Sequence, residues 1–83
     1  MESNMNQRLA SLLAEVFGLR QEQIVLTLTK DDVAVWDSLK QMDLVVSLER
    51  EFDLVLDIPD IVRMNSVSSI VETLALKGVD LGA

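Results

Sequence analysis

The tripeptide Asp37-Ser38-Leu39 contains the side chain in this chain that is best placed to take part in a reaction. A serine hydroxyl can be esterified, but as a catalytic nucleophile it needs an adjacent base. The chain contains no histidine and no cysteine, so it lacks the usual activating base, the thiol nucleophile and the common zinc ligands. We therefore predict no catalytic residue and no enzyme activity. Ser38 can either cap a helix or be a point at which a group is attached.

Acidic residues near this tripeptide do not indicate a metal site. Asp31, Asp32 and Asp37 lack the spacing and the glycine of a calcium-binding loop. We predict no metal site.

The tripeptide stands at the start of an amphipathic segment that predicts a helix over Ser38–Phe52. Ser38 followed by Gln41 fits a capping box, in which the serine side chain caps the helix. At about 100° per residue, one group of apolar side chains falls on a stripe wide enough to face a core. That stripe contains Leu44, Val45, Leu48 and Phe52.

A second apolar group lies on the other side of the same predicted helix. Charged residues border it, and an apolar patch with a charged rim is typical of a docking surface. Periodicity alone leaves a second interpretation equally open, in which the next short helix covers this group. The apolar members are Leu39, Met42 and Val46, and the charged ones are Asp43, Glu49 and Arg50.

Helical periodicity also predicts a first helix from about Asn4 to Phe17, which Gly18 ends. The apolar stretch Ile24–Leu28 is compatible with a short strand, but a lone strand has no partner here. We favour a long ordered loop in which Trp36 is a wedge against the bundle. The side chains expected to anchor this loop to the core are Ile24, Leu26 or Leu28, and Val33 or Val35.

Two further helices are predicted near the C-terminus. A short one covers about Asp60 to Met64 after Pro59, and a longer one starts at Ser66, with Lys77 in its last turn and Gly78 beyond. The sum is an all-α bundle of three main helices and one short one, with a long loop between the first two. We expect a single domain over residues 1–83, with an ordered core over 4–77 and a flexible tail over 78–83. The shared face of the last helix contains Val67, Ile70, Val71 and Leu74.

Composition restricts the partners. The 83 residues are 49% hydrophobic, which suits one small core, and the net charge of −7 disfavours nucleic acid. No segment reaches the roughly 20 apolar residues that cross a bilayer. We expect a soluble, cytoplasmic monomer.

The order of these elements resembles the acyl carrier proteins. The resemblance rests on "DSL" at Asp37–Leu39, on the helix that ends "LEREF" at Leu48–Phe52, and on "NSVSSIVETL" at Asn65–Leu74. It covers about Leu9 to Leu76, which is nearly the whole chain.

The resemblance implies that Ser38 carries 4'-phosphopantetheine, donated from coenzyme A by a phosphopantetheinyl transferase. The thiol of this arm would hold an acyl group as a thioester. Asp37 and Leu39 would help the transferase recognise the site. Acyl-loading and acyl-processing enzymes with basic docking patches would meet the second helix at Leu39, Met42, Asp43, Val46, Glu49 and Arg50.

Lys40 and Arg50 depart from the acidic second helix of fatty-acid carriers, so a carrier for a specialised pathway is expected. A peptidyl carrier is disfavoured, because such domains usually have Gly-Gly-His-Ser where this chain has Val35-Trp36-Asp37-Ser38. An unmodified protein-interaction module remains the alternative from another class.

Overall fold

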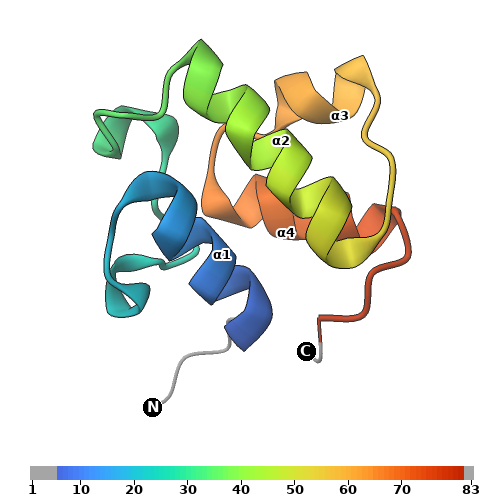
Figure 1. The fold of residues 1–83 in the computed structure, drawn as a ribbon, viewed down its shortest axis with the longest axis horizontal. Coiled ribbons are helices and arrows are strands. Elements are labelled where there is room, and N and C mark those ends of the chain that lie inside the picture. The colour runs from blue at the N-terminus through green and yellow to red at the C-terminus, as the bar shows by residue number, and fades with distance from the viewer. Residues whose placement is uncertain (1–5, 82–83) are drawn as a thin grey trace.

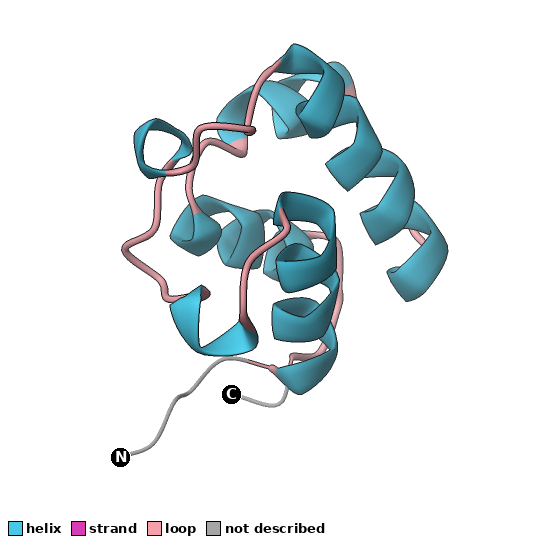
Figure 2. Ribbon diagram, turned by 60° about the vertical axis from the view of Figure 1, so that its left-hand side comes forward, coloured by secondary structure: helices cyan, strands magenta, loops and turns pink. Residues whose placement is uncertain are grey.

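The computed structural model describes residues 6–81 and shows a small helical bundle (Figure 1). The predicted all-α fold of three main helices and one short helix is confirmed, with the long loop between the first two. Within the described residues there is no strand, and only an isolated bridge joins Thr29 and Ser66. Figure 2 shows helices joined by loops, some of them long. The elements are α1 (Gln7–Phe17), η1 (Gln21–Gln23), η2 (Lys30–Asp32), α2 (Ser38–Phe52), α3 (Ile58–Arg63) and α4 (Val67–Leu76).

Capping residues define both ends of α1. The Asn6 side chain accepts a hydrogen bond from the Leu9 N–H at 3.1 Å, so the helix begins at Gln7. The predicted start at Asn4 lies outside the described residues. Gly18 ends the helix with φ of 69°, a left-handed conformation that glycine adopts without strain.

The long loop after α1 is fastened to the core, as predicted. Ile24 and Val33 are buried and Leu28 is half-buried, whereas Leu26 and Val35 are exposed. The structure therefore selects among the anchors that the sequence left open. Backbone hydrogen bonds also tie this loop to the start of α4, because the Val67 N–H donates to the Leu28 carbonyl at 2.9 Å.

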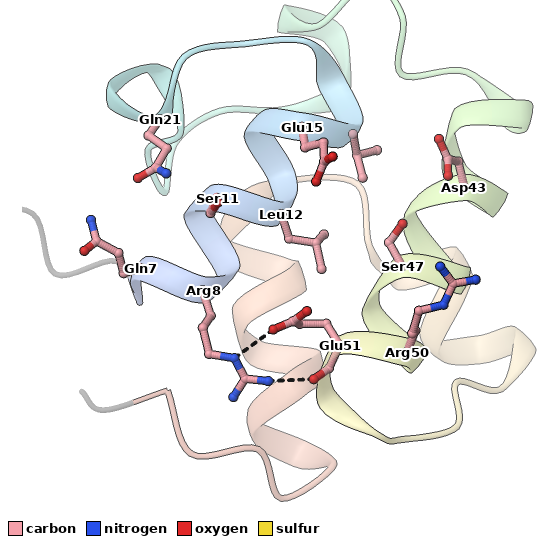
Figure 3. Close-up of a pocket in the computed structure, with 11 residues that line it drawn as sticks. Gln7, Arg8, Ser11, Leu12, Glu15, Gln21, Asp43, Ser47, Arg50 and Glu51 are labelled. Atoms are coloured by element: carbon pink, nitrogen blue, oxygen red, sulfur yellow. Dashed lines mark hydrogen bonds and ion pairs between the residues drawn. The ribbon is translucent and has the colours of Figure 1, made fainter.

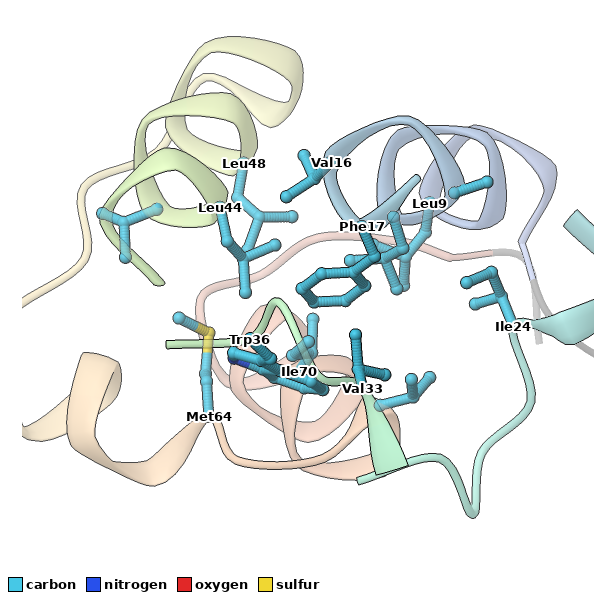
Figure 4. Packing of buried hydrophobic residues seen from close by; sticks show 14 of the residues in the cluster. Leu9, Val16, Phe17, Ile24, Val33, Trp36, Leu44, Leu48, Met64 and Ile70 are labelled. Atoms are coloured by element: carbon cyan, nitrogen blue, oxygen red, sulfur yellow. The ribbon is translucent and has the colours of Figure 1, made fainter. Parts of the chain in front are cut away.

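The core lies where the apolar faces of α1, α2 and α4 meet the loop (Figure 4). Trp36 is 3% exposed, and its ring lies against Phe17 with centroids 4.5 Å apart, which confirms its expected place as a wedge. On α2, the core stripe is confirmed, although Phe52 is only partly buried. The largest fully buried side chains are Leu9, Leu13, Leu44, Leu48, Met64, Val67, Ile70, Thr73 and Leu74.

The two C-terminal helices differ slightly from the prediction. α3 begins at Ile58 rather than at Asp60, because Asp57 is its N-cap and Pro59 is tolerated in the first turn. α4 begins after Ser66, as predicted, and the Ser66 hydroxyl accepts from the Ser69 N–H at 3.1 Å.

The C-terminal end of α4 also differs from the prediction. The helix ends at Leu76, so Lys77 follows the last turn instead of lying within it.

The segment after Gly78 contacts the bundle. The Val79 N–H donates to the Leu74 carbonyl at 3.0 Å, and the Asn6 side-chain amide donates to the Leu81 carbonyl at 3.1 Å. Val79 and Leu81 are half-buried against the core. The flexibility expected for residues 78–83 stays a prediction, and residues 82–83 lie outside the described part.

A charged contact fastens α3 to the end of α4. The Lys77 ammonium lies 2.7 Å from an Asp60 carboxylate oxygen, which also accepts from the Asp57 N–H at 3.0 Å. The hydrogen bond from Lys77, followed by that from Asp57, lowers the pKa of the Asp60 carboxyl below its ordinary value. The same contact raises the pKa of Lys77.

These shifts predict that the contact contributes stability over a defined pH window. The Asp60 contribution is present above the unfolded-state pKa and is lost as pH falls through the lowered folded-state pKa. The Lys77 contribution is present below its unfolded-state pKa and is lost as pH rises through the raised one. We expect Asp60→Asn to lose less stability than wild type on acidification below about pH 4. Urea unfolding midpoints measured across this range, with the exposed Asp53→Asn as control, test it. Equal acid dependence in wild type and Asp60→Asn would contradict the prediction.

Candidate functional site

The N-cap of α2 is Asp37, and Ser38 is the first helical residue. The Asp37 carboxylate accepts from the Lys40 N–H at 2.9 Å, and its carbonyl accepts from the Gln41 N–H at 2.8 Å. The predicted capping box from Ser38 to Gln41 is therefore wrong. Aspartate and serine both cap well, and the extended backbone at Asp37 gives that residue the role.

Because Asp37 caps the helix, the Ser38 hydroxyl is left open. Ser38 is exposed, and its hydroxyl has no hydrogen-bond partner within residues 6–81. Over the same range, no hydrogen bond engages the backbone N–H groups of Ser38 and Leu39, two of the donors that every helix leaves unpaired at its start. An exposed hydroxyl thus stands beside free donors at the positive end of the helix dipole.

Gln41 has a tertiary role in place of the predicted local one. Its side-chain oxygen accepts from the Trp36 indole N–H at 2.6 Å. Its amide nitrogen donates to the Ile61 carbonyl at 2.9 Å and to the Met64 carbonyl at 3.1 Å. One side chain therefore joins the loop before Ser38, the first turn of α2 and the end of α3.

The second apolar group of α2 is exposed. The exposed fractions are 83% for Leu39, 51% for Met42 and 48% for Val46. α3 lies beside α2 (Figure 1). The exposed fractions show that it does not cover these side chains. The structure thus decides the question that periodicity left open. α3 and the loop before it expose three more apolar residues that the sequence reasoning missed, namely Val55, Ile58 and Val62.

The charged rim is largely engaged in contacts within the chain. Asp43 lies 3.7 Å from the Lys40 ammonium. Glu49 is half-buried, and its carboxylate accepts from the Leu56 N–H at 2.9 Å, so it holds the loop between α2 and α3. Arg50 is exposed and makes no ion pair within the described residues. Of the three predicted rim residues, only Asp43 has an ion pair within the described residues; Glu49 and Arg50 have none.

A polar groove of about 690 Å³ runs between α1 and α2 (Figure 3). Arg50 and Asp43 line it, and Ser38 does not. The Arg8 guanidinium donates to the Glu51 carboxylate at 2.9 Å and to the Glu51 carbonyl at 2.6 Å, and it lies 4.8 Å from the centre of the Phe52 ring. These contacts join the two helices at some distance along α2 from the candidate site.

Residues 6–81 contain no cluster of three or more histidine, cysteine or acidic residues that could hold a metal ion. Over the same residues, no helix is long and apolar enough to cross a membrane.

The observed cap predicts the effect of substituting Asp37. We expect Asp37→Ala to lower the free energy of unfolding by about 0.5 to 2 kcal/mol, since the Lys40 N–H loses its acceptor. Asp37→Asn keeps a capping oxygen and should stay close to wild type. Urea unfolding measures both variants. A cost for Asp37→Asn as large as that for Asp37→Ala would show that the carboxylate does not act as a cap.

The sequence matches a known protein family. A family model described as "Phosphopantetheine attachment site" matches residues 7–74, from the first residue of α1 to the last turn of α4. The chain belongs to this family. It is therefore a carrier protein whose prosthetic group is covalently attached 4'-phosphopantetheine.

The candidate site fits a phosphopantetheine group. Attachment needs an accessible oxygen, and Ser38 is exposed at the start of α2. A phosphodiester carries negative charge, which the helix start favours through the free N–H groups of Ser38 and Leu39.

Proposed function

We propose that the chain is an acyl carrier protein with Ser38 as its attachment residue. The proposal rests on the different roles of Asp37 and Ser38 at the start of α2. Asp37 caps the helix, so the Ser38 hydroxyl is exposed and free of hydrogen bonds within residues 6–81. The hydroxyl is therefore accessible to a transferase and is not needed as the cap of α2.

The attachment step needs chemistry from outside this chain. The Ser38 oxygen forms a bond to the phosphorus of the pantetheine phosphate in coenzyme A, and adenosine bisphosphate leaves with the electrons of the broken P–O bond. The hydroxyl proton passes to a base of the transferase. Once attached, the arm supplies a thiol that holds an acyl group as a thioester.

The same start of α2 offers features for recognition by a transferase. Leu39 follows the serine and is the most exposed of the apolar residues on α2, so a partner can bury it at the moment of modification. Asp37 lies on the other side, with its carboxylate exposed even while it caps the helix. These two residues are proposed as the recognition elements that flank Ser38.

Docking of loading and processing enzymes is proposed for the apolar surface of Leu39, Met42 and Val46. Burial of such side chains contributes about 25 cal/mol per Å² of apolar area. Basic patches on these partners can meet the Glu49 carboxylate, which keeps its negative charge while it accepts from the neutral Leu56 N–H, whereas Asp43 is paired with Lys40. Arg50 instead favours an acidic group at the edge of the partner's docking surface.

The test is the intact mass of the protein after incubation with coenzyme A and a broad-specificity phosphopantetheinyl transferase. We expect one added group, located on the peptide that contains Ser38. A folded wild-type protein that gains no mass with several transferases would favour the unmodified interaction module. Loading of the modified protein with acyl or aminoacyl groups by matched ligases then separates an acyl carrier from a peptidyl carrier.

A further inference from the structure

Gln41 occupies an unusual place near the proposed attachment residue. Its amide uses the oxygen and the nitrogen in three hydrogen bonds, of 2.6, 2.9 and 3.1 Å, to partners outside α2. A solvent-facing glutamine of a helix has no need of such contacts. All three partners are parts of the elements that flank the start of α2, namely the loop on one side and α3 on the other.

We propose that Gln41 is a positioning residue for attachment at Ser38. The inference rests on the proposed function and adds a residue that the family match does not assign. Gln41 holds the loop and α3 in fixed places around the first turn of α2, so that Ser38 is presented in one geometry.

The loop side of this contact is rigid. Trp36 is 3% exposed and packs on Phe17 of α1, so its indole is fixed by the core before it reaches Gln41. Figure 4 shows the indole close to Phe17, Val33 and Met64. Ser38 lies two residues after Trp36 and three before Gln41. The hydrogen bond between Trp36 and Gln41 therefore joins the residues on the two sides of Ser38.

The α3 side depends on the same amide. At the end of α3, the Ile61 carbonyl already accepts from the Met64 N–H at 3.2 Å, whereas within residues 6–81 the Met64 carbonyl accepts from Gln41 alone. Gln41 donates to the Ile61 carbonyl in the last turn of α3 and to the Met64 carbonyl just beyond it. Without this donor, the end of α3 loses part of its connection to α2, and the surface around Ser38 becomes more mobile.

Mobility at this point reduces the rate of attachment. A transferase binds the fraction of molecules in which loop, Ser38 and α3 are correctly arranged, and its apparent affinity falls with that fraction. The expected signature is a lower kcat/KM for attachment in a protein that is still folded.

Two substitutions test separately the contact of Gln41 with α3 and its contact with the Trp36 indole. Gln41→Glu keeps the shape and the acceptor for the Trp36 indole, but it places a carboxylate oxygen against the carbonyls of Ile61 and Met64. Trp36→Phe keeps an aromatic ring in the core and removes the indole donor. Thr73→Val serves as the control for stability, because it removes a buried hydrogen bond of 2.7 Å to the Ser69 carbonyl within α4.

The measurement is kcat/KM of the transferase on each variant, with circular dichroism as the check of folding. We expect Gln41→Glu to lower kcat/KM by about tenfold, which is the scale of one buried polar group left unsatisfied. Trp36→Phe should act in the same direction, and Thr73→Val should react like wild type. The chain has one tryptophan, so the NMR signal of its indole N–H reports the contact directly and should be retained in Gln41→Glu but shifted in Gln41→Met.

Attachment to Gln41→Glu and Trp36→Phe within twofold of wild type would overturn the proposal. An equal loss in Thr73→Val would also overturn it, since the effect would then follow stability alone. If Gln41→Glu does not fold, the comparison of Trp36→Phe with Thr73→Val still decides. Failure of the proposed function gives a different result, because wild type itself would then take up no group or take it up elsewhere.

Discussion

Ser38→Ala abolishes attachment of phosphopantetheine while the protein stays folded; this is the largest effect we expect. Alanine removes the only oxygen that the proposal uses. It should change the free energy of unfolding by less than about 0.5 kcal/mol, because Asp37 rather than Ser38 caps α2 and the Ser38 side chain makes no hydrogen bond within the described residues. Intact mass after incubation with coenzyme A and transferase measures attachment, and urea unfolding measures stability.

Ser66→Ala is the matched control. Ser66 also stands at the start of a helix, but its hydroxyl is engaged as the N-cap of α4. This variant should accept the group like wild type and lose about 0.5 to 2 kcal/mol of stability. The two substitutions are thus expected to show opposite patterns. Label found on Ser66, or on Ser38→Ala itself, would refute the assignment of the attachment residue.

The helices could be predicted because their signals are local. Leu9 and Leu13 recur at helical spacing, and Gly18 provides the stop that the structure confirms. The sequence predicts the N-cap of α2 one residue too late, at Ser38 instead of Asp37, because the two residues are adjacent and both are good caps. The choice between them depends on the backbone angles at Asp37, which tertiary packing of the preceding loop determines.

The contacts of Gln41 could not be predicted from local patterns. Its spacing from Ser38 suggests a capping box, whereas its partners on α3 lie 20 and 23 residues further along the chain. The exposure of Met42 was undecided for the same reason. Periodicity identifies the face of a helix, but only the placement of α3 shows whether that face is covered. Glu49 likewise has the charge expected of a rim residue, and only the folded loop reveals its bond to Leu56.

The second large effect is expected at the core side of α2. Leu44 is 0% exposed and packs in the cluster around Trp36, so Leu44→Ala should lower the free energy of unfolding by about 2 to 5 kcal/mol. The cost combines the lost burial of the side chain with the cavity that remains. In a domain of this size, that is a large part of the total stability, since small domains have about 5 to 15 kcal/mol in all. Phe52→Ala should cost less, because Phe52 is only half-buried.

Val46→Ala, two residues further along the same helix, tests whether the proposed docking surface is distinct from the core face of α2. Val46 is half exposed and lies outside the buried cluster, so its truncation should shift the urea midpoint little, by less than about 0.5 kcal/mol. The same variant should weaken the binding of partner enzymes, because the contact area of the apolar surface falls. Leu44→Ala should show the reverse pattern wherever it remains folded. A stability loss for Val46→Ala as large as that for Leu44→Ala would mean that this side chain belongs to the core, and the proposed docking surface would then lose one of its three apolar residues.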